Sequence, residues 1–303
     1  MSGSGLIALG ILSVVAPALP GIAGKTKSLL TGRRGPPVLQ LYADLRKLLG
    51  KGAVYSRTTT WLFRAAPVVV LVTLFVAALL LPVDGREASA AFTGDLVAFA
   101  GLLALGRFAL VLAGLDTGSS FEGLGASREV TIASFAEPAL LLCFIALVLA
   151  TGDLSLSGML GTPLAAAWPR AGASLSLVGI SLFVLLLAEN SRVPVDDPAT
   201  HLELTMIHEV IVLDHSGPDL ALILYGSAFK LALFGVLVVS VFVPRAGFST
   251  PAALALLIAG LGVAAVAVGI VESAMARLRL VRVPQLLVGA AALALFATIL
   301  QLG

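Results

Sequence analysis

The feature of this sequence that most constrains its fold is a series of eight apolar runs. A membrane-spanning helix needs about 20 predominantly apolar residues, and these runs approach or reach that length. Only 12% of the 303 residues are charged, whereas a soluble domain is about a quarter charged. The sequence therefore predicts an all-α, polytopic membrane protein of about eight transmembrane helices, with residues 1–303 forming a single integral membrane domain. The expected spans are Leu6–Gly24, Trp61–Pro82, Leu96–Leu115, Val130–Ala150, Ala171–Ala188, Leu220–Val243, Pro251–Val271 and Val283–Leu302.

The distribution of basic residues predicts the orientation of these spans. The loops after the first, third, fifth and seventh spans hold 13 Lys and Arg residues, and the opposite loops hold 3. Loops rich in Lys and Arg remain in the cytoplasm. We therefore expect a multi-pass protein of the cytoplasmic (inner) membrane with both termini outside and two long cytoplasmic loops, residues 25–60 and 189–219.

The first long loop contains an amphipathic segment, Pro37–Gly50. Val38, Leu41 and Leu45 recur at helical spacing in this segment, and the charged side chains point elsewhere. This pattern predicts a helix that lies in the membrane interface. The alternative is that the segment packs only on its own bundle.

The second long loop is acidic and holds all three histidines of the chain, His201, His208 and His215. Histidines seven residues apart on a helix are about 10 Å apart, too far for two of them to bind one metal ion. No metal site is therefore expected. Apolar residues run between the acids, among them Met206 and Ile211, and such residues are not left exposed. We expect a partner subunit to cover this loop; the alternative is a solvated acidic face.

Four charged residues inside or beside the apolar runs are candidates for a functional role: Arg107, Glu137, Glu189 and Lys230. A charge at the bilayer centre costs at least about 2.5–3.5 kcal/mol, so such groups face the bundle interior and pair. The functional interpretation is a proton pathway that leads inward from the acidic loop. The structural interpretation is a set of ion pairs that hold helices together, and Arg107 has the further alternative of reaching the interface.

Three groups of residues carry a family resemblance. The second long loop reads Ala188-Glu189-x-x-Arg192-x-Pro194-x-Asp196-x-Pro198, then Glu203-Leu204, His208-Glu209 and Ser216-Gly217. The first long loop carries Gly35-Pro36, Gln40, Ala43-Asp44 and Lys47, and a third group is Leu124-Gly125-Ala126-Ser127-Arg128 with Glu137. In this order and on these loops, they resemble the superfamily of complex I membrane subunit 1, which forms the membrane side of the quinone cavity.

The resemblance implies roles for two sets of residues. The amphipathic helix of the first loop would include Gln40, Asp44 and Lys47. The second loop would dock a partner and couple to it through Arg192, Asp196, Asp197, Glu203, His208 and Glu209.

Within the superfamily, the stretch Pro194-Val195-Asp196-Asp197-Pro198-Ala199-Thr200-His201 and the long interval before Ser216 are similar to the hydrogenase branch. That branch comprises formate hydrogenlyase subunit 4 and the corresponding subunits of hydrogenase-4 and energy-converting hydrogenases. The resemblance implies a bacterial or archaeal membrane anchor that docks a [NiFe]-hydrogenase-type redox arm and links electron transfer to proton or sodium translocation. Its implied partners are hydrogenase-like large and small subunits, an iron–sulfur subunit, antiporter-like membrane subunits and the lipid bilayer.

The nickel–iron centre and the iron–sulfur clusters would lie in those partners, because this chain has a single cysteine, Cys143. No catalytic residue is predicted, since no nucleophile–base pair, phosphate loop or metal motif is visible. No cofactor and no nucleic acid are expected to bind this chain. The alternative is a quinone-binding subunit of an NADH:quinone oxidoreductase-like complex, although the departures from the complex I motifs put a quinone site in doubt. A stand-alone transporter is a third interpretation, but the internal repeat common in transporters is absent.

Overall fold

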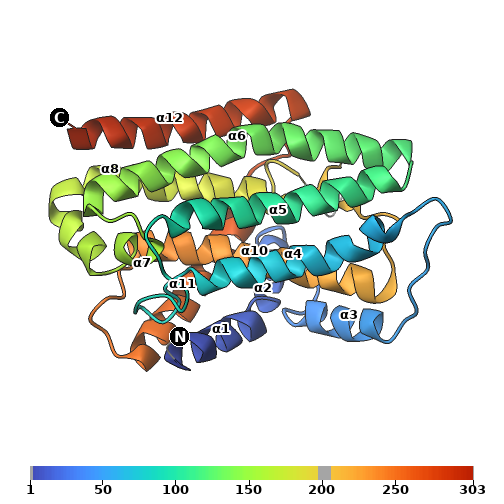
Figure 1. Cartoon of the computed structure of the whole chain (residues 1–303), viewed down its shortest axis with the longest axis horizontal. Coiled ribbons are helices and arrows are strands. Elements are labelled where there is room, and N and C mark those ends of the chain that lie inside the picture. Colours follow the sequence, from blue (N-terminus) through green and yellow to red (C-terminus); the bar gives the residue numbers. More distant parts are fainter. Residues whose placement is uncertain (1–2, 197–205, 303) are drawn as a thin grey trace.

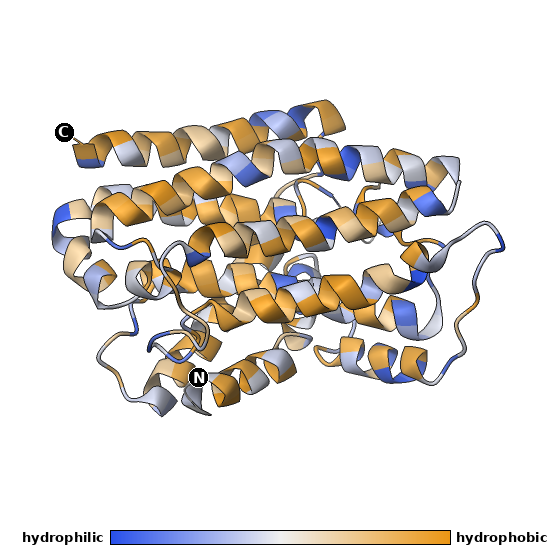
Figure 2. Cartoon of the chain, viewed as in Figure 1, coloured by the Kyte–Doolittle hydropathy of each residue, from blue (hydrophilic) through white to orange (hydrophobic). Residues whose placement is uncertain are grey.

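The structure, a computed structural model, describes residues 3–196 and 206–302, and this part of the chain contains helices and no strand (Figure 1). Eight of its helical segments are long and apolar enough to cross a membrane, which confirms the predicted fold class. Figure 2 shows that hydrophobic residues dominate these segments over most of their length. The helices are α1 (Gly3–Val15), α2 (Ala18–Leu30), α3 (Gln40–Leu49), α4 (Trp61–Leu79), α5 (Asp95–Asp116), α6 (Ser120–Thr151), α7 (Leu156–Met159), α8 (Thr162–Glu189), α9 (His208–Ile211), α10 (Gly217–Phe242), α11 (Thr250–Ala274) and α12 (Val283–Leu302).

Helix α10 occupies the centre of the bundle. It packs against α4, α8 and α11, and it is the most buried of the eight spans. Around it, α5 packs on α4 and α6, α12 packs on α6 and α8, and α2 packs on α11. Apolar side chains that point away from this core, such as Val263 and Leu295, remain exposed. Such an exterior suits lipid, because lipid tails are as apolar as these side chains.

Two spans begin well before the predicted residue. Helix α6 begins at Ser120, ten residues before the expected Val130, and α8 begins at Thr162 rather than at Ala171. The expected spans began where hydropathy rises, after the last polar residue. The backbone hydrogen bonds of a helix also run through polar residues, so these helices begin earlier. In α8, Ala171, two residues after Pro169, has non-helical φ and ψ values (−120° and 18°). A proline inside a helix removes a backbone hydrogen bond and causes this kind of kink.

The first long loop forms the predicted short helix, α3. This helix packs against α2 and α10, but none of its residues is buried. The Tyr42 hydroxyl donates a hydrogen bond to the carbonyl of Val14 and ties α3 to the first span. The position of α3 relative to a membrane surface stays a prediction.

The described part of the second long loop packs largely inside the bundle. Helix α8 ends at Glu189, whose carboxylate contacts Lys230 midway along α10. The other half of α10 therefore extends beyond the end of α8, toward the end of the bundle that carries both long loops, here called the loop end. Residues 206–212 occupy the space there between α5 and α6.

Two glycines make this packing possible. A Cβ atom on Gly125 would lie 2.9 Å from Ile211 Cγ1 and 3.1 Å from the carbonyl oxygen of Ile207. A Cβ atom on Gly114 would lie 3.0 Å from Ile211 Cγ2. The loop backbone thus approaches α5 and α6 as closely as glycine allows.

Candidate ion-pair site

Arg107 is the centre of a buried ion-pair cluster. It lies midway along α5, its side chain is only 7% exposed, and it contacts three carboxylates. Its Nη2 atom lies 2.6 Å from Glu189 and its Nε atom lies 3.4 Å from Glu129. Its Nη1 atom donates to Glu137. Arg107 therefore points into the bundle, and the alternative in which it reaches the interface is wrong.

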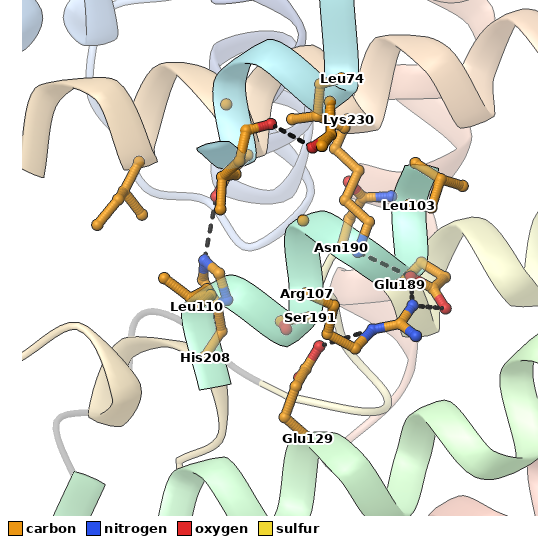
Figure 3. A pocket seen from close by; sticks show the side chains of 16 residues that line it. Leu74, Leu103, Arg107, Leu110, Glu129, Glu189, Asn190, Ser191, His208 and Lys230 are labelled. Carbon is orange, nitrogen blue, oxygen red and sulfur yellow. Dashed lines mark hydrogen bonds and ion pairs between the residues drawn. The ribbon is translucent and has the colours of Figure 1, made fainter. Parts of the chain in front are cut away.

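Lys230 extends the cluster. Its Nζ atom lies 2.7 Å from Glu189 Oε2, so Glu189 binds both cations (Figure 3). Glu189 is the last residue of α8 and its side chain is 6% exposed, whereas the sequence suggested a carboxylate at the edge of a loop. Four helices, α5, α6, α8 and α10, thus contribute the two cations and three carboxylates of the cluster.

A cavity of about 80 Å³ adjoins the cluster. One buried water requires roughly 10–15 Å³ by this measure, so the cavity has room for several. Its polar lining comprises Thr73, Arg107, Glu129, Glu189, Asn190, Ser191, His208, Ser227 and Lys230 (Figure 3). Polar groups that face a space of this size can be connected by water.

His208 stands on the loop side of this cavity. Its Nε2 atom lies 3.1 Å from Ser227 Oγ on α10. Burial lowers the pKa of His208, because desolvation penalises the charged imidazolium. A neutral imidazole both donates and accepts a proton, which suits it to a position between the loop and the cluster.

Two charged side chains of the described loop, Arg192 and Asp196, are paired inside the chain. Asp196 is buried, pairs with Arg277 at 2.9 Å and accepts a hydrogen bond from the Ile207 amide at 2.9 Å. Arg192 pairs with Glu272 at 3.4 Å. The chain itself buries Met206, Ile207, Val210, Ile211 and Val212, so the reason given for a covering partner does not hold for these residues. Glu209 is half-buried, and Asp197 and Glu203 lie outside the described residues.

The end of this loop is joined to the first loop. Ser216 Oγ accepts a hydrogen bond from the Val54 amide at 2.9 Å. Beside it, the buried His215 ring stacks on Phe63 with 3.9 Å between ring centroids. Burial lowers the pKa of His215 to about 4, so its ring is neutral at ordinary pH.

The sequence analysis named four of the five charged residues of the cluster, and the structure brings these four together. It missed Glu129, because the expected span began one residue later, at Val130. The signal was available, since Glu129 directly follows the Leu124–Arg128 motif. Gln40, Asp44 and Lys47 lie on α3 outside the cluster, with Gln40 Nε2 donating to Asp44 Oδ1 at 2.9 Å. Within the described residues, no group of three or more His, Cys, Asp or Glu side chains is arranged to hold a metal ion.

The helical bundle, its charged cluster and the two long loops at one end agree with the architecture expected of the complex I-like membrane subunits. The NADH dehydrogenase family model matches residues 4–302. The chain belongs to this family.

Curated relatives agree with that assignment. Formate hydrogenlyase subunit 4 of Escherichia coli K12 is 33% identical over 291 residues, covering 93% of this chain and 92% of the relative. Hydrogenase-4 component C of the same organism is 33% identical and covers 77% and 73%. An NADH-quinone oxidoreductase subunit of Rickettsia felis is 26% identical and covers 78% and 73%.

Among solved structures, a chain of the membrane-bound sulfane sulfur reductase, an archaeal respiratory membrane complex, superposes with a TM-score of 0.84. The superposition covers 98% of both chains at 19% sequence identity. At this identity the match shows a shared fold.

Proposed function

We propose that this chain is the membrane anchor and coupling subunit of a respiratory assembly that docks a [NiFe]-hydrogenase-type redox arm. It links electron transfer in that arm to translocation of protons or sodium ions. The observation that carries the proposal is the physical continuity between the Arg107 cluster and the second loop. Glu189 belongs to the cluster and is followed directly by the loop residues that line the same cavity, Asn190 and Ser191.

The charge balance of the cluster supports proton handling. Glu129, Glu137 and Glu189 outnumber Arg107 and Lys230 by one. When the cluster takes up one proton, its single excess negative charge is neutralised, and release of the proton restores that charge. The net charge of the cluster therefore never exceeds one. A displacement of residues 190–191 changes the distance from Glu189 to its two cations, which shifts the proton affinity of the neighbouring carboxylates.

The docking side is the loop end, which is cytoplasmic in the orientation expected from the 13-to-3 division of Lys and Arg residues. Both termini then lie outside. The partners are hydrogenase-like large and small subunits, an iron–sulfur subunit and antiporter-like membrane subunits. The partners would hold the nickel–iron centre and the iron–sulfur clusters. The two relatives at 33% identity, both named as hydrogenase or hydrogenlyase components, favour this choice of arm.

The second candidate is a quinone-binding subunit, which the more distant NADH-quinone oxidoreductase relatives suggest. The cavity beside the cluster is too small to hold a quinone ring. Its volume of about 80 Å³ is smaller than the roughly 150 Å³ of a cavity that binds benzene, and a quinone ring is larger than benzene.

The test is to measure assembly and coupled turnover together in the purified complex, for Glu129→Gln and Glu137→Gln. Each substitution removes a titrating group but leaves Arg107 with two carboxylates. We expect normal assembly and a fall in coupled turnover of about tenfold or more, because each relay group contributes at least that much. Glu87→Gln in an exposed loop serves as the control. Wild-type coupled turnover in both variants would rule out the relay.

A further inference from the structure

A groove on the outer surface of the bundle opens directly onto the ion-pair cluster. It runs between α5 and α6. Arg107 and Glu137 line it together with Gly101, Ala104, Leu105, Phe108, Val111, Val130, Ala133 and Ser134. The cluster therefore borders the cavity described above and, through the groove, also reaches the outer surface of the bundle.

The most exposed charged side chain in the groove is a carboxylate. The Glu137 side chain is 44% exposed, while its partner Arg107 is 7% exposed. Glu137 stands midway along α6, so in a bilayer it lies at the depth of the lipid tails. Lipid tails offer neither a hydrogen-bond donor nor a counter-charge, and an ionisable group at this depth pairs with protein or faces a water-filled cavity.

The residues that line the groove suit the packing of a helix against it. Gly101, Ala104, Ala133 and Ser134 are small side chains, and small residues allow the backbones of two membrane helices to approach closely. Phe108, beside them, is 58% exposed. An incoming helix would pack on the small residues and cover this ring.

We propose that the groove binds a transmembrane helix of a second membrane subunit, and that this helix presents a lysine or another hydrogen-bond donor to Glu137. The inference rests on the proposed function and extends it by naming the chemistry of the neighbour. Charge complementarity carries it, because the carboxylates of the cluster exceed its cations by one and Glu137, at 44%, is the most exposed of the three.

Two other occupants fit the groove less well. A second copy of this chain related by a two-fold axis would place the same patch, with its excess carboxylate, on both sides of the interface. Like charges at this depth repel. A lipid chain would fill the space but would offer no donor to the exposed side of the carboxylate, which Arg107 does not cover.

The first experiment places the photo-crosslinking residue p-benzoylphenylalanine at Phe108 in the membrane-embedded complex. Val263, 70% exposed on α11, is the matched control position. We expect Phe108 to crosslink to a hydrophobic span of another membrane subunit that contains a donor side chain within two helical turns of the crosslink. Crosslinking to lipid alone, to a soluble subunit or to a second copy of this chain would overturn the proposal.

The second experiment fills the groove with Ser134→Trp. Ser134 is exposed, so the bundle itself can accept the larger side chain, and Ile270→Trp on α11 is the control. We expect the crosslinked subunit to be lost from the purified complex while the amount of this chain in the membrane stays at the wild-type level. Retention of that subunit at full stoichiometry would overturn the proposal.

The outcomes also separate the two proposals. A crosslinked helix together with normal coupling in Glu129→Gln and Glu137→Gln would leave the groove occupied and refute the relay. Lipid-only crosslinking together with uncoupling in those variants would refute the docking helix and leave the relay in place.

Discussion

The two long loops leave the same end of the bundle, but the described part of the second packs far more deeply into it than the first. In the first loop, α3 has no buried residue, and Arg46 and Lys47 are exposed. In the second loop, Ile211 is fully buried and Asp196 pairs inside the chain with Arg277. The difference does not follow from hydrophobic content alone, since both segments mix apolar and charged residues. The difference depends on what each loop can pack against. The second loop meets the space left where α8 ends, and cations inside the chain neutralise its acids.

The largest expected effect is that of removing Arg107. Arg107→Ala leaves three carboxylates of the cluster with Lys230 as their one cation, and removing one partner of a buried ion pair costs about 3–5 kcal/mol. We expect the amount of folded chain in the membrane to fall severely, as measured by quantitative immunoblotting. Arg46→Ala on the exposed loop helix is the control. If both variants accumulate equally, the cluster does not stabilise the bundle.

The next effect tests whether the second loop is part of the core. Ile211→Ala removes a fully buried side chain and is expected to cost about 2–5 kcal/mol. Leu39→Ala, at a position 63% exposed in the first loop, is expected to change stability by less than about 0.5 kcal/mol. Thermal unfolding in detergent can be followed with a thiol-reactive dye, because the lone cysteine, Cys143, is buried. Equal melting temperatures for the two variants would remove the distinction between the loops.

A smaller, pH-dependent effect is expected where the two loops join. The pKa of His215 is about 4 in the folded chain, below the usual 6.5. Between these values the unfolded chain binds the proton and the folded chain does not, so stability falls as the pH is lowered from about 6.5 towards 4. His215→Phe keeps a ring beside Phe63 and removes the titration. Melting followed by tryptophan fluorescence should show a steeper loss on acidification in the wild type, and parallel pH profiles would contradict this assignment.

The smallest effect is expected on the surface of α3. Gln40→Ala removes the hydrogen bond to Asp44, a pair four residues apart on an exposed helix. Such pairs contribute about 0.2–0.5 kcal/mol. The melting temperature should therefore remain within about a degree or two of the wild type. A drop as large as that of Ile211→Ala would mean that α3 is as integral to the bundle as the second loop.

Much of the fold could be predicted from the sequence, because apolar runs of bilayer length leave few alternatives. Arg107, Glu137 and Lys230 could be identified for the same reason, since a charge inside such a run stands out. Glu129 escaped because hydropathy marks where a helix becomes apolar, not where its hydrogen bonds begin. The inward packing of residues 206–212 also escaped, because it depends on α8 ending beside Lys230. Only the three-dimensional arrangement shows the space that this leaves.

The distribution of the cluster over four helices has a consequence for biogenesis. Arg107 enters the membrane with α5, before α6 brings its first carboxylate partners, Glu129 and Glu137, into the bilayer. An unpaired arginine at the bilayer centre costs at least about 2.5–3.5 kcal/mol on insertion scales. Lys230 is synthesised after Glu189 and so meets a carboxylate already in place. The nascent chain is therefore most vulnerable to membrane quality control in the interval between insertion of α5 and arrival of α6.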